Sequence, residues 1–402
     1  INRLSAKLKR PGSSVFDEVW HNASKNTLEN AKEENKMDEL RRKKILEDLR
    51  KINALFKEED ITHVVGYDYK SGEPIQPLVK EQWFISTKPL AKKALEALEN
   101  NEIKFTPENK KNVLAEYLKN IRDWNISRQI PWGIPIPAFQ NIEDPTDSIF
   151  DERVHESQIE VNGKTYKRDE DTLDTWFSSG QWPFITTDFL EGGELSKFYP
   201  NSVMETGHDL IFPWISRMIM LGIYCTGQIP FREVYLHGMV LDEHGQKMSK
   251  SKGNVINPMD VIAEFGSDAF RLGIIASRSA GQNQAFSKNK VIAGRNFCNK
   301  LWNISRFVQG MVDESETNST ETSVVEYTTE NAGEDWICHE INRASSMLEQ
   351  AMSEYRFSEA VEIVYSLVWD KYADWFLESQ KIFKNISLLK KTLENVLMMI
   401  DR

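Results

Sequence analysis

From residue 124 to residue 300, short apolar runs alternate with longer segments of helical periodicity. The runs "SVMET" (202–206) and "EVYLHGMVL" (233–241) have the length of buried strands, and an apolar helical pattern lies between them. Strands that alternate with helices in this way are typical of βαβ units and a parallel sheet. The alternation predicts an α/β fold whose ligand lies outside the carboxyl ends of the strands.

Upstream of this region the patterns are more mixed. Residues 38–56 place apolar side chains at helical spacing and predict an amphipathic helix. The turn signal "KSGEP" (70–74) predicts a hairpin, and residues 88–123 look helical with a break at "KFTPEN" (104–109).

The end of the chain is purely helical. Apolar stripes run from Ile337 to Ala351 and from Phe357 to Trp375, and a third helix begins near Ser387. Amphipathic helices of this kind bury one another, so an all-α helical bundle is expected. The segment 313–335 before it holds eight acidic residues and no Lys or Arg, and it accounts for most of the net charge of −11. It predicts a polar linker.

Bulk properties narrow the class of protein. The chain of 402 residues has no apolar run of 18 residues, so no membrane span is expected. Its three cysteines are too far apart for a CxxC metal site, which predicts no structural zinc and a reducing, cytoplasmic setting. The chain begins with Ile1 and ends inside a helical pattern, and we therefore expect it to be a piece of a longer protein.

The segment "HGQKMSKSKGN" (244–254) concentrates three lysines between two glycines. Flexible ammonium groups such as those of Lys247 and Lys250 bind phosphate oxygens as point charges, and small serines let the backbone approach a ligand closely. A solvated lysine-rich surface loop is the alternative for a generic cluster of this kind.

Within this segment, "KMSKS" matches the signature of class I aminoacyl-tRNA synthetases. The surrounding sequence resembles the valine-specific enzymes of that family. The resemblance runs from about residue 37 to the end, and its six segments follow the family's order: "QWFISTKPLA" (82–91), "WNISRQIPWGIPIP" (124–137), "DTWFSSGQWPF" (174–184), "ETGHDLIFPWISRMIMLG" (205–222), "LHGMVLDEHGQKMSKSKGNVINP" (236–258) and "YRFSEAVEIVYSLVWDKYADWFLES" (355–379).

The resemblance implies a domain organisation. Residues 1–80 would hold the tail of an editing insertion and its return to the sheet, with residues 1–36 unassigned. Residues 81–300 would form the second half of a Rossmann-like parallel-sheet catalytic domain, with the lysine loop and a stem-contact region. Residues 301–335 would be the acidic linker, and residues 336–402 the start of an anticodon-binding helical bundle.

The resemblance also implies an activity. In that family a valine carboxylate attacks the α-phosphorus of ATP, pyrophosphate leaves, and the aminoacyl group passes to the 3′ end of tRNA(Val). Catalysis is positioning and charge stabilisation. Lys247 and Lys250 are the expected catalytic residues. The expected ATP-binding residues are these two lysines with Met248, Ser249, Ser251, His237, Gly238, Glu205, Gly207 and Asp209.

Two residues are candidates for the amino-acid pocket. Trp176 is a flat, rigid wall suited to a small branched side chain, although a large aromatic packs in a core more often than in a pocket. Leu210 is a weaker second candidate. The stretch "ETGHD" (205–209) resembles the valine enzymes more than the isoleucine enzymes, but His208 stands where tyrosine is common. Pro213 lies within a helical run and is expected to kink it.

The expected partners are valine, ATP with its own Mg²⁺, and tRNA(Val), with a monomeric protein and no membrane. A His-x-Gly-His signature is absent from the chain, so the chain by itself is expected to be inactive. Three alternatives stay open: another branched-aliphatic enzyme such as the isoleucyl enzyme, a tRNA-binding module without catalysis, and a nucleotidyltransferase that shares the fold.

Overall fold

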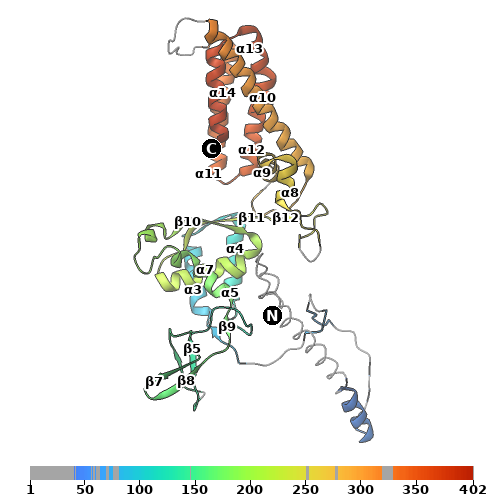
Figure 1. Ribbon diagram of the computed structural model, residues 1–402, viewed down its shortest axis with the longest axis vertical. Coiled ribbons are helices and arrows are strands. Elements are labelled where there is room, and N and C mark those ends of the chain that lie inside the picture. The colour runs from blue at the N-terminus through green and yellow to red at the C-terminus, as the bar shows by residue number, and fades with distance from the viewer. Residues whose placement is uncertain are drawn as a thin grey trace. The chain divides into compact units, whose positions relative to one another are not determined.

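The computed structural model describes residues 40, 42–55, 57, 59, 64–68, 72–75, 81–144, 146–249, 253–276, 279–318 and 329–401 (Figure 1). The chain forms two compact units. The first unit comprises Ile1–Lys88 and Arg122–Ser179, and the second comprises Pro89–Ile121 and Gly180–Arg402. The segment 81–300, expected as one catalytic domain, contributes to both units.

The second unit contains the parallel sheet that the alternating pattern predicts. Its three strands are β10 (Asn201–Gly207), β11 (Phe231–His237) and β2 (Lys104–Thr106), in the order β10-β11-β2, and both pairings are parallel. The register pairs Gly207 with His237, so the carboxyl ends of β10 and β11 lie side by side. The α/β fold class is therefore confirmed.

Side chains alternate between the two faces of this sheet. Phe105, Met204 and Val234 are buried in a core with three helices, α3 (Lys88–Glu99), α4 (Asn109–Lys119) and α7 (Ser216–Thr226). Because side chains alternate along a strand, the residues next to Met204 and Val234 point to the opposite face. That face carries Glu205 and Tyr235, and it is the face that contributes to the candidate site.

The chain from β10 to α7 passes through irregular helix. A 3₁₀ turn covers His208–Leu210 and a π-helical turn covers Ile211–Ile215 before α7 begins at Ser216. Pro213 lies in the π turn, and because proline lacks an N–H group the regular hydrogen-bond ladder cannot run through it. The predicted distortion at Pro213 is confirmed. The Arg217 guanidinium donates to the Pro213 carbonyl at 2.6 Å.

A smaller layer follows β11. Strand β12 (Val240–Leu241) pairs in parallel with β13 (Gln284–Ala285), and helices α8 (Pro258–Phe265) and α9 (Ser267–Ile275) lie between them in sequence. Helix α8 begins with Asn257 as its N-cap, whose side chain accepts from the Met259 N–H, and with proline at the first turn. The elements α6 (Trp182–Ile185) and η1 (Glu194–Phe198) precede β10.

The helical bundle expected after residue 336 is present. Its elements are α10 (Lys288–Asn318), α11 (Ala332–Ser353), α12 (Phe357–Ser366), η5 (Leu367–Leu377), α13 (Glu378–Phe383) and α14 (Ile386–Asp401). Figure 1 shows the long helices packed lengthwise, and they share one apolar core.

The linker expected over 301–335 is helical at its start, which corrects that boundary. Helix α10 continues to Asn318 because Ile304, Val308 and Val312 carry the apolar stripe onward at four-residue spacing and are buried in the bundle core. Residues 319–328 of the linker lie outside the described residues. Helix α11 begins at Ala332, capped by the Asn331 side chain, which accepts from two backbone N–H groups.

Trp375 does not belong to the buried stripe in which the sequence placed it. Its exposed fraction is 72%, whereas Tyr372 and Phe376 are buried. The cause is η5, a π-helical segment of 11 residues. A π-helix has more residues per turn than an α-helix, so the face that an α-helical period assigns to the core shifts along this segment.

The first unit is built mainly of short strands. Four of them form an antiparallel sheet in the order β6-β5-β8-β7, with bounds Ser148–Phe150, Ala138–Asn141, Lys164–Arg168 and Gln158–Val161 respectively. Two further pairs are β1 (Phe84–Ile85) with β3 (Trp124–Asn125), and β4 (Ser127–Arg128) with β9 (Thr172–Leu173). Helix α5 (Thr175–Ser179) follows β9.

The N-terminal part of this unit agrees with two local predictions. Residues 42–51 are helical within the predicted helix 38–56, and the helix ends earlier because Asn53 adopts a left-handed conformation with φ 51°. An antiparallel bridge joins Tyr67 to Pro74 across the predicted "KSGEP" turn.

Candidate functional site

The carboxyl ends of β10 and β11 bring two predicted ATP-binding side chains together. His237 Nε2 lies 3.4 Å from Glu205 Oε1. The other ring nitrogen, Nδ1, lies 2.8 Å from the Gly238 carbonyl oxygen. Because a carbonyl can only accept, Nδ1 carries the hydrogen in that bond. Nε2, the other ring nitrogen, faces the Glu205 carboxylate at the mouth of the site.

A pocket of about 420 Å³ opens at these strand ends. Three of its lining residues were predicted from the sequence, namely Glu205, His237 and Gly238. The pocket combines a mostly apolar wall with a few polar groups, which is the usual composition of a small-molecule site. The remaining lining residues are Val203, Tyr235, Ile275, Ser279, Tyr355 and Phe357.

The aromatic wall of this pocket was not predicted. The rings of Tyr235, Tyr355 and Phe357 form a triangle with centroids 5.5–6.1 Å apart. Tyr355 precedes α12 with φ 57°, and Lys104 Nζ lies 5.9 Å from the centre of its ring. Burial raises the pKa of the Tyr355 hydroxyl, helped by its hydrogen bond with Glu233. Local sequence patterns could not predict this contact, because Tyr235 and Tyr355 are more than a hundred residues apart in the chain.

The predicted lysine loop faces the turn that follows β10. Lys247 Nζ lies 3.5 Å from Asp209 Oδ2, and both side chains are largely exposed. Gly207, at the end of β10, is buried, and a Cβ there would lie 2.8 Å from Asp209 Oδ1. The structure therefore brings Gly207, Asp209 and Lys247 into one neighbourhood.

Gly238 is required for a reason that the sequence did not reveal. It was expected to let the backbone approach adenine, but the close approach in the structure is internal. A Cβ at this position would lie 1.5 Å from the Gln282 carbonyl oxygen. Only glycine fits such a contact between two backbone segments.

The Asn283 side chain contacts both the segment that follows β11 and the turn that follows β10. Its Oδ1 accepts from the Met239 backbone N–H at 2.8 Å and lies 2.8 Å from His208 Nε2. His208, the residue that departs from the usual tyrosine, is thus tied to the segment that follows Gly238. No spacing rule identifies Asn283, because it lies 75 residues from His208.

The base of the lysine loop is organised by Asp242. Its carboxylate accepts from the backbone N–H groups of Gln246 at 2.7 Å and His244 at 3.0 Å, and from the Asn254 side chain at 2.8 Å. These donors, led by the Gln246 N–H, hold the pKa of Asp242 below its usual range. The "DEHG" turn signal, an Asp three residues before a Gly, could have identified this anchor.

Asn254 closes the other end of the loop. Its Oδ1 accepts from the Ser249 backbone N–H at 2.9 Å, and Met248 is half-buried with its sulfur 3.5 Å from the Ile256 N. Lys250 and Ser251, also predicted as site residues, lie outside the described residues. The described part of the loop is hydrogen-bonded at both ends, and its Lys247 side chain is exposed.

The two predicted amino-acid pocket residues lie in different units. Trp176 is half-buried in α5 of the first unit, and Leu210 is half-buried at the end of the 3₁₀ turn in the second unit. Because Trp176 is only half-buried, it differs from a tryptophan packed in a core, which would be buried.

Two further properties concern metals and membranes. Within the described ranges, no three His, Cys, Asp or Glu side chains are grouped so that they could hold a metal ion. No helix in the same part of the chain combines the length and the apolar character that a bilayer span requires.

Two family descriptions match this sequence. The family described as "tRNA synthetases class I (I, L, M and V)" matches residues 15–287, and "Anticodon-binding domain of tRNA ligase" matches residues 334–401. The second match coincides with the helical bundle after α10.

Curated relatives are similar over most of this chain. Valine–tRNA ligase of Mesoplasma florum is 39% identical over 371 residues, which is 89% of this chain and 42% of that protein. Valine–tRNA ligase of Fusobacterium nucleatum is 40% identical over 345 residues, which is 85% of this chain and 39% of that protein. The chain thus spans roughly two fifths of the length of these relatives.

Solved structures share the fold. The Mycobacterium tuberculosis methionyl-tRNA synthetase in complex with methionyl-adenylate has a TM-score of 0.61 at 17% identity, covering 84% of this chain and 62% of that chain. The ternary complex LeuRS-tRNA-LeuAMS of Agrobacterium radiobacter K84 has a TM-score of 0.56 at 20% identity, covering 72% and 42%.

Proposed function

Because the chain belongs to the class I tRNA synthetases of the isoleucine, leucine, methionine and valine group, we propose that it serves the ATP-dependent ligation of valine to tRNA(Val). The reaction forms valyl-adenylate and then transfers the valyl group to the 3′ end of the tRNA. The chain acts as part of a longer protein, since it spans only about two fifths of its curated relatives. By itself it is inactive.

The observation that carries this proposal is the meeting of separate motifs at one sheet edge. Glu205 and His237 lie 3.4 Å apart at neighbouring parallel strand ends, and Lys247 lies 3.5 Å from Asp209 just beyond them. Nucleotides bind at such strand ends in open α/β sheets. The relatives that are 37–40% identical to this chain are named valine–tRNA ligases, which favours valine as the amino acid.

Each side chain has a role in the proposal. Glu205 accepts from ribose hydroxyls, and the segment of His237 and Gly238 lies against the adenine. Lys247 and Lys250 bind the phosphates and stabilise charge that moves to the leaving pyrophosphate. Met248, Ser249 and Ser251 complete the phosphate-binding loop. Trp176 of the first unit is the candidate wall for the valine side chain, and Leu210 of the second unit is the weaker candidate.

The partners follow from the reaction. Mg²⁺ arrives bound to the ATP phosphates and is part of the substrate. The helical bundle that matches an anticodon-binding domain contacts tRNA(Val). We further propose a monomeric, cytoplasmic protein.

The proposal is tested in a completed enzyme. This enzyme joins the part of the Mesoplasma florum relative that the chain does not match to the 402-residue chain. Valine-dependent ATP–pyrophosphate exchange and charging of tRNA(Val) are measured, with isoleucine and threonine as competing amino acids and Lys247→Ala as the matched inactive control.

The expected result is valine-dependent exchange that Lys247→Ala strongly reduces. Preference for isoleucine would assign the chain to the isoleucyl enzymes. Binding of tRNA by a folded completed enzyme that activates no amino acid would favour a tRNA-binding module. Exchange by the 402-residue chain alone would contradict the need for a longer protein.

A further inference from the structure

In the first unit, the Asp174 carboxylate accepts hydrogen bonds from two segments that each carry a tryptophan. Asp174 has only 4% of its surface exposed, and its Oδ2 accepts from the Trp124 indole Nε1 at 3.0 Å. A buried carboxylate is costly unless charged or polar donors surround it. The donors here come from the neighbouring strands β3 and β4, and Trp124 lies 50 residues before Asp174 in the chain.

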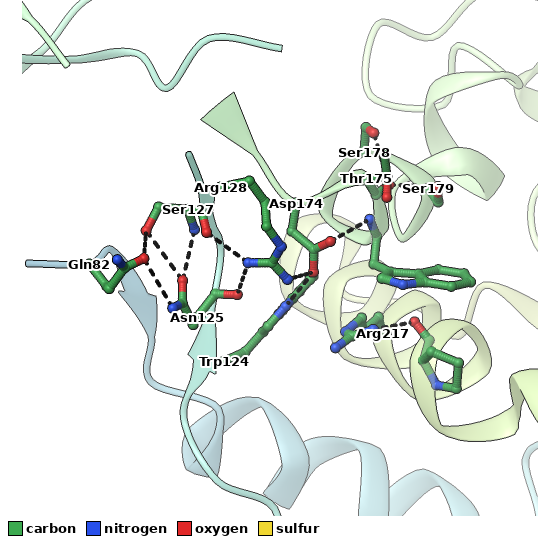
Figure 2. Close-up of polar contacts among 12 residues, drawn as sticks. Gln82, Trp124, Asn125, Ser127, Arg128, Asp174, Thr175, Ser178, Ser179 and Arg217 are labelled. Carbon is green, nitrogen blue, oxygen red and sulfur yellow. Dashed lines mark hydrogen bonds and ion pairs between the residues drawn. The ribbon is translucent and has the colours of Figure 1, made fainter. Parts of the chain in front are cut away.

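Arg128 supplies the compensating charge. Its Nη2 lies 2.9 Å from Asp174 Oδ2, and its Nη1 donates to the carbonyl oxygens of Asn125 at 3.1 Å and Ser127 at 2.7 Å. Figure 2 shows the Arg128 fork and the Trp124 ring both directed at Asp174. A planar guanidinium can satisfy these acceptors together, which an ammonium group cannot do in the same geometry.

The same aspartate also begins α5. Its Oδ1 accepts from the Trp176 backbone N–H at 3.5 Å, its carbonyl accepts from the Phe177 N–H at 2.8 Å, and its own N–H donates to the Ile126 carbonyl at 2.6 Å. Helix α5 has five residues. A helix this short cannot hold its own direction through internal hydrogen bonds, so its orientation depends on how its start is anchored.

We infer that Asp174, neutralised by Arg128, is a positioning residue that sets the orientation of Trp176 and so the shape of a pocket for a small branched aliphatic side chain. This inference rests on the proposed function, in which Trp176 lines the valine pocket. Asp174 touches no substrate atom; it acts through the start of α5.

The chain offers a matched control for this role. Asp169 accepts from the Trp83 indole Nε1 at 2.8 Å in the same unit. It makes the same kind of carboxylate–indole bond, but its carboxylate does not cap α5. Comparing Asp174→Asn with Asp169→Asn therefore separates the anchoring of α5 from the general loss of an indole partner.

The first measurement uses the 402-residue chain and needs no activity. The chain is labelled with 5-fluorotryptophan, and the ¹⁹F resonance of Trp176 is assigned by its loss in Trp176→Phe. Asp174→Asn and Arg128→Lys should shift or broaden this resonance, whereas Asp169→Asn should leave it in place. An unmoved Trp176 resonance in folded Asp174→Asn would overturn the inference, whatever the enzyme does.

The second measurement uses the completed enzyme. Asp174→Asn should raise the KM for valine about 10- to 100-fold, as a displaced positioning group does, with little change in the KM for ATP. Arg128→Lys should have a smaller effect because it keeps the charge. The double variant with Trp176→Ala should be no worse than Trp176→Ala, since both changes act on one wall.

The possible failures differ. If Asp174→Asn and Trp176→Ala each raise the KM for valine and the double variant shows the product of the two increases, the two residues act independently. That result would overturn the inference but leave the pocket role of Trp176 intact. A valine KM that Trp176→Ala does not change would overturn the pocket assignment in the proposed function, and with it the specificity role of Asp174. Equal losses of stability in Asp174→Asn and Asp169→Asn, with unchanged KM values, would reduce Asp174 to a structural residue.

Discussion

Lys247 and Asp209 form an ion pair at 3.5 Å between the lysine loop and the turn after β10. The Lys247 side chain is 68% exposed and that of Asp209 is 42% exposed, so water screens the attraction. Exposed pairs of this kind contribute about 0–1 kcal/mol. The pair therefore holds the loop weakly, and a phosphate group can compete for the lysine.

We predict that Lys250→Ala in the completed enzyme slows valyl-adenylate formation roughly a hundredfold, about 3 kcal/mol, and leaves valine binding almost intact. The reason is that its ammonium meets the phosphates most strongly as charge moves to pyrophosphate. Pre-steady-state adenylate formation at saturating ATP and valine measures the effect. Lys250→Arg should rescue only partly, and Ser251→Ala should cost much less. If Lys250→Ala forms adenylate at the parental rate, the segment 244–254 is a solvated lysine-rich loop without a catalytic role.

Gly238→Ala should destabilise the second unit by about 3 kcal/mol, because the new methyl group would overlap the Gln282 carbonyl and force two backbone segments apart. Chemical denaturation of the 402-residue chain measures the change. Gly310→Ala is the control: apart from its own helix backbone, no atom of the described residues lies within 4 Å of its added Cβ, and alanine in a helix should stabilise α10 by up to about 1 kcal/mol. Equal effects at the two glycines would contradict the contact.

Trp176→Ala should raise the KM for valine about 10- to 100-fold and change the KM for ATP little, since a pocket wall binds only the amino acid. Trp132→Ala, which removes a tryptophan that is 54% exposed in the same unit, is the control. Steady-state exchange kinetics in the completed enzyme provide both constants. A Trp176→Ala protein that fails to fold would instead support a core role for this ring.

The antiparallel sheet of the first unit should lose stability in acid through Asp147. Its Oδ2 accepts from the Lys164 ammonium at 2.9 Å, the Asn141 amide at 3.1 Å and the Tyr166 hydroxyl at 2.9 Å. These bonds, led by that from Lys164, lower the pKa of Asp147 from 3.8 to about 2. The lowered value means that the stabilisation is complete above pH 3.8 and disappears as the pH falls toward 2.

The measurement is the denaturation midpoint of the first unit, followed by NMR signals of its sheet between pH 5 and about 2. Asp147→Asn should remove this pH-dependent component, because an amide does not titrate in this range. Asp151→Asn is the comparison for a local ion pair, since Asp151 has the same lowered pKa of about 2 but its described side-chain bonds go only to Arg153, two residues away. A pH profile that Asp147→Asn leaves unchanged would show that other groups cause the acid loss.

The sequence by itself determined the fold class, and it supplied the hypothesis for the residues of the site. Alternating apolar runs were enough to predict the parallel sheet, since strand and helix periods are local properties of the chain. The same holds for the helical bundle, the turn at Gly72 and the distortion at Pro213. The lysine motif could be identified because its residues are adjacent in sequence. In the structure, the Lys247 side chain of this motif is exposed and lies beside Asp209.

Only the tertiary structure decided the long-range contacts. Asn283 bonds to Met239 and lies against His208, and the Gln282 carbonyl requires glycine at 238. Trp375 became exposed because a π-helical segment shifted the register of its helix. These features depend on which segments meet in space and on small departures from ideal helix geometry. A local pattern carries neither kind of information, because the energies that decide them arise between residues far apart in the chain.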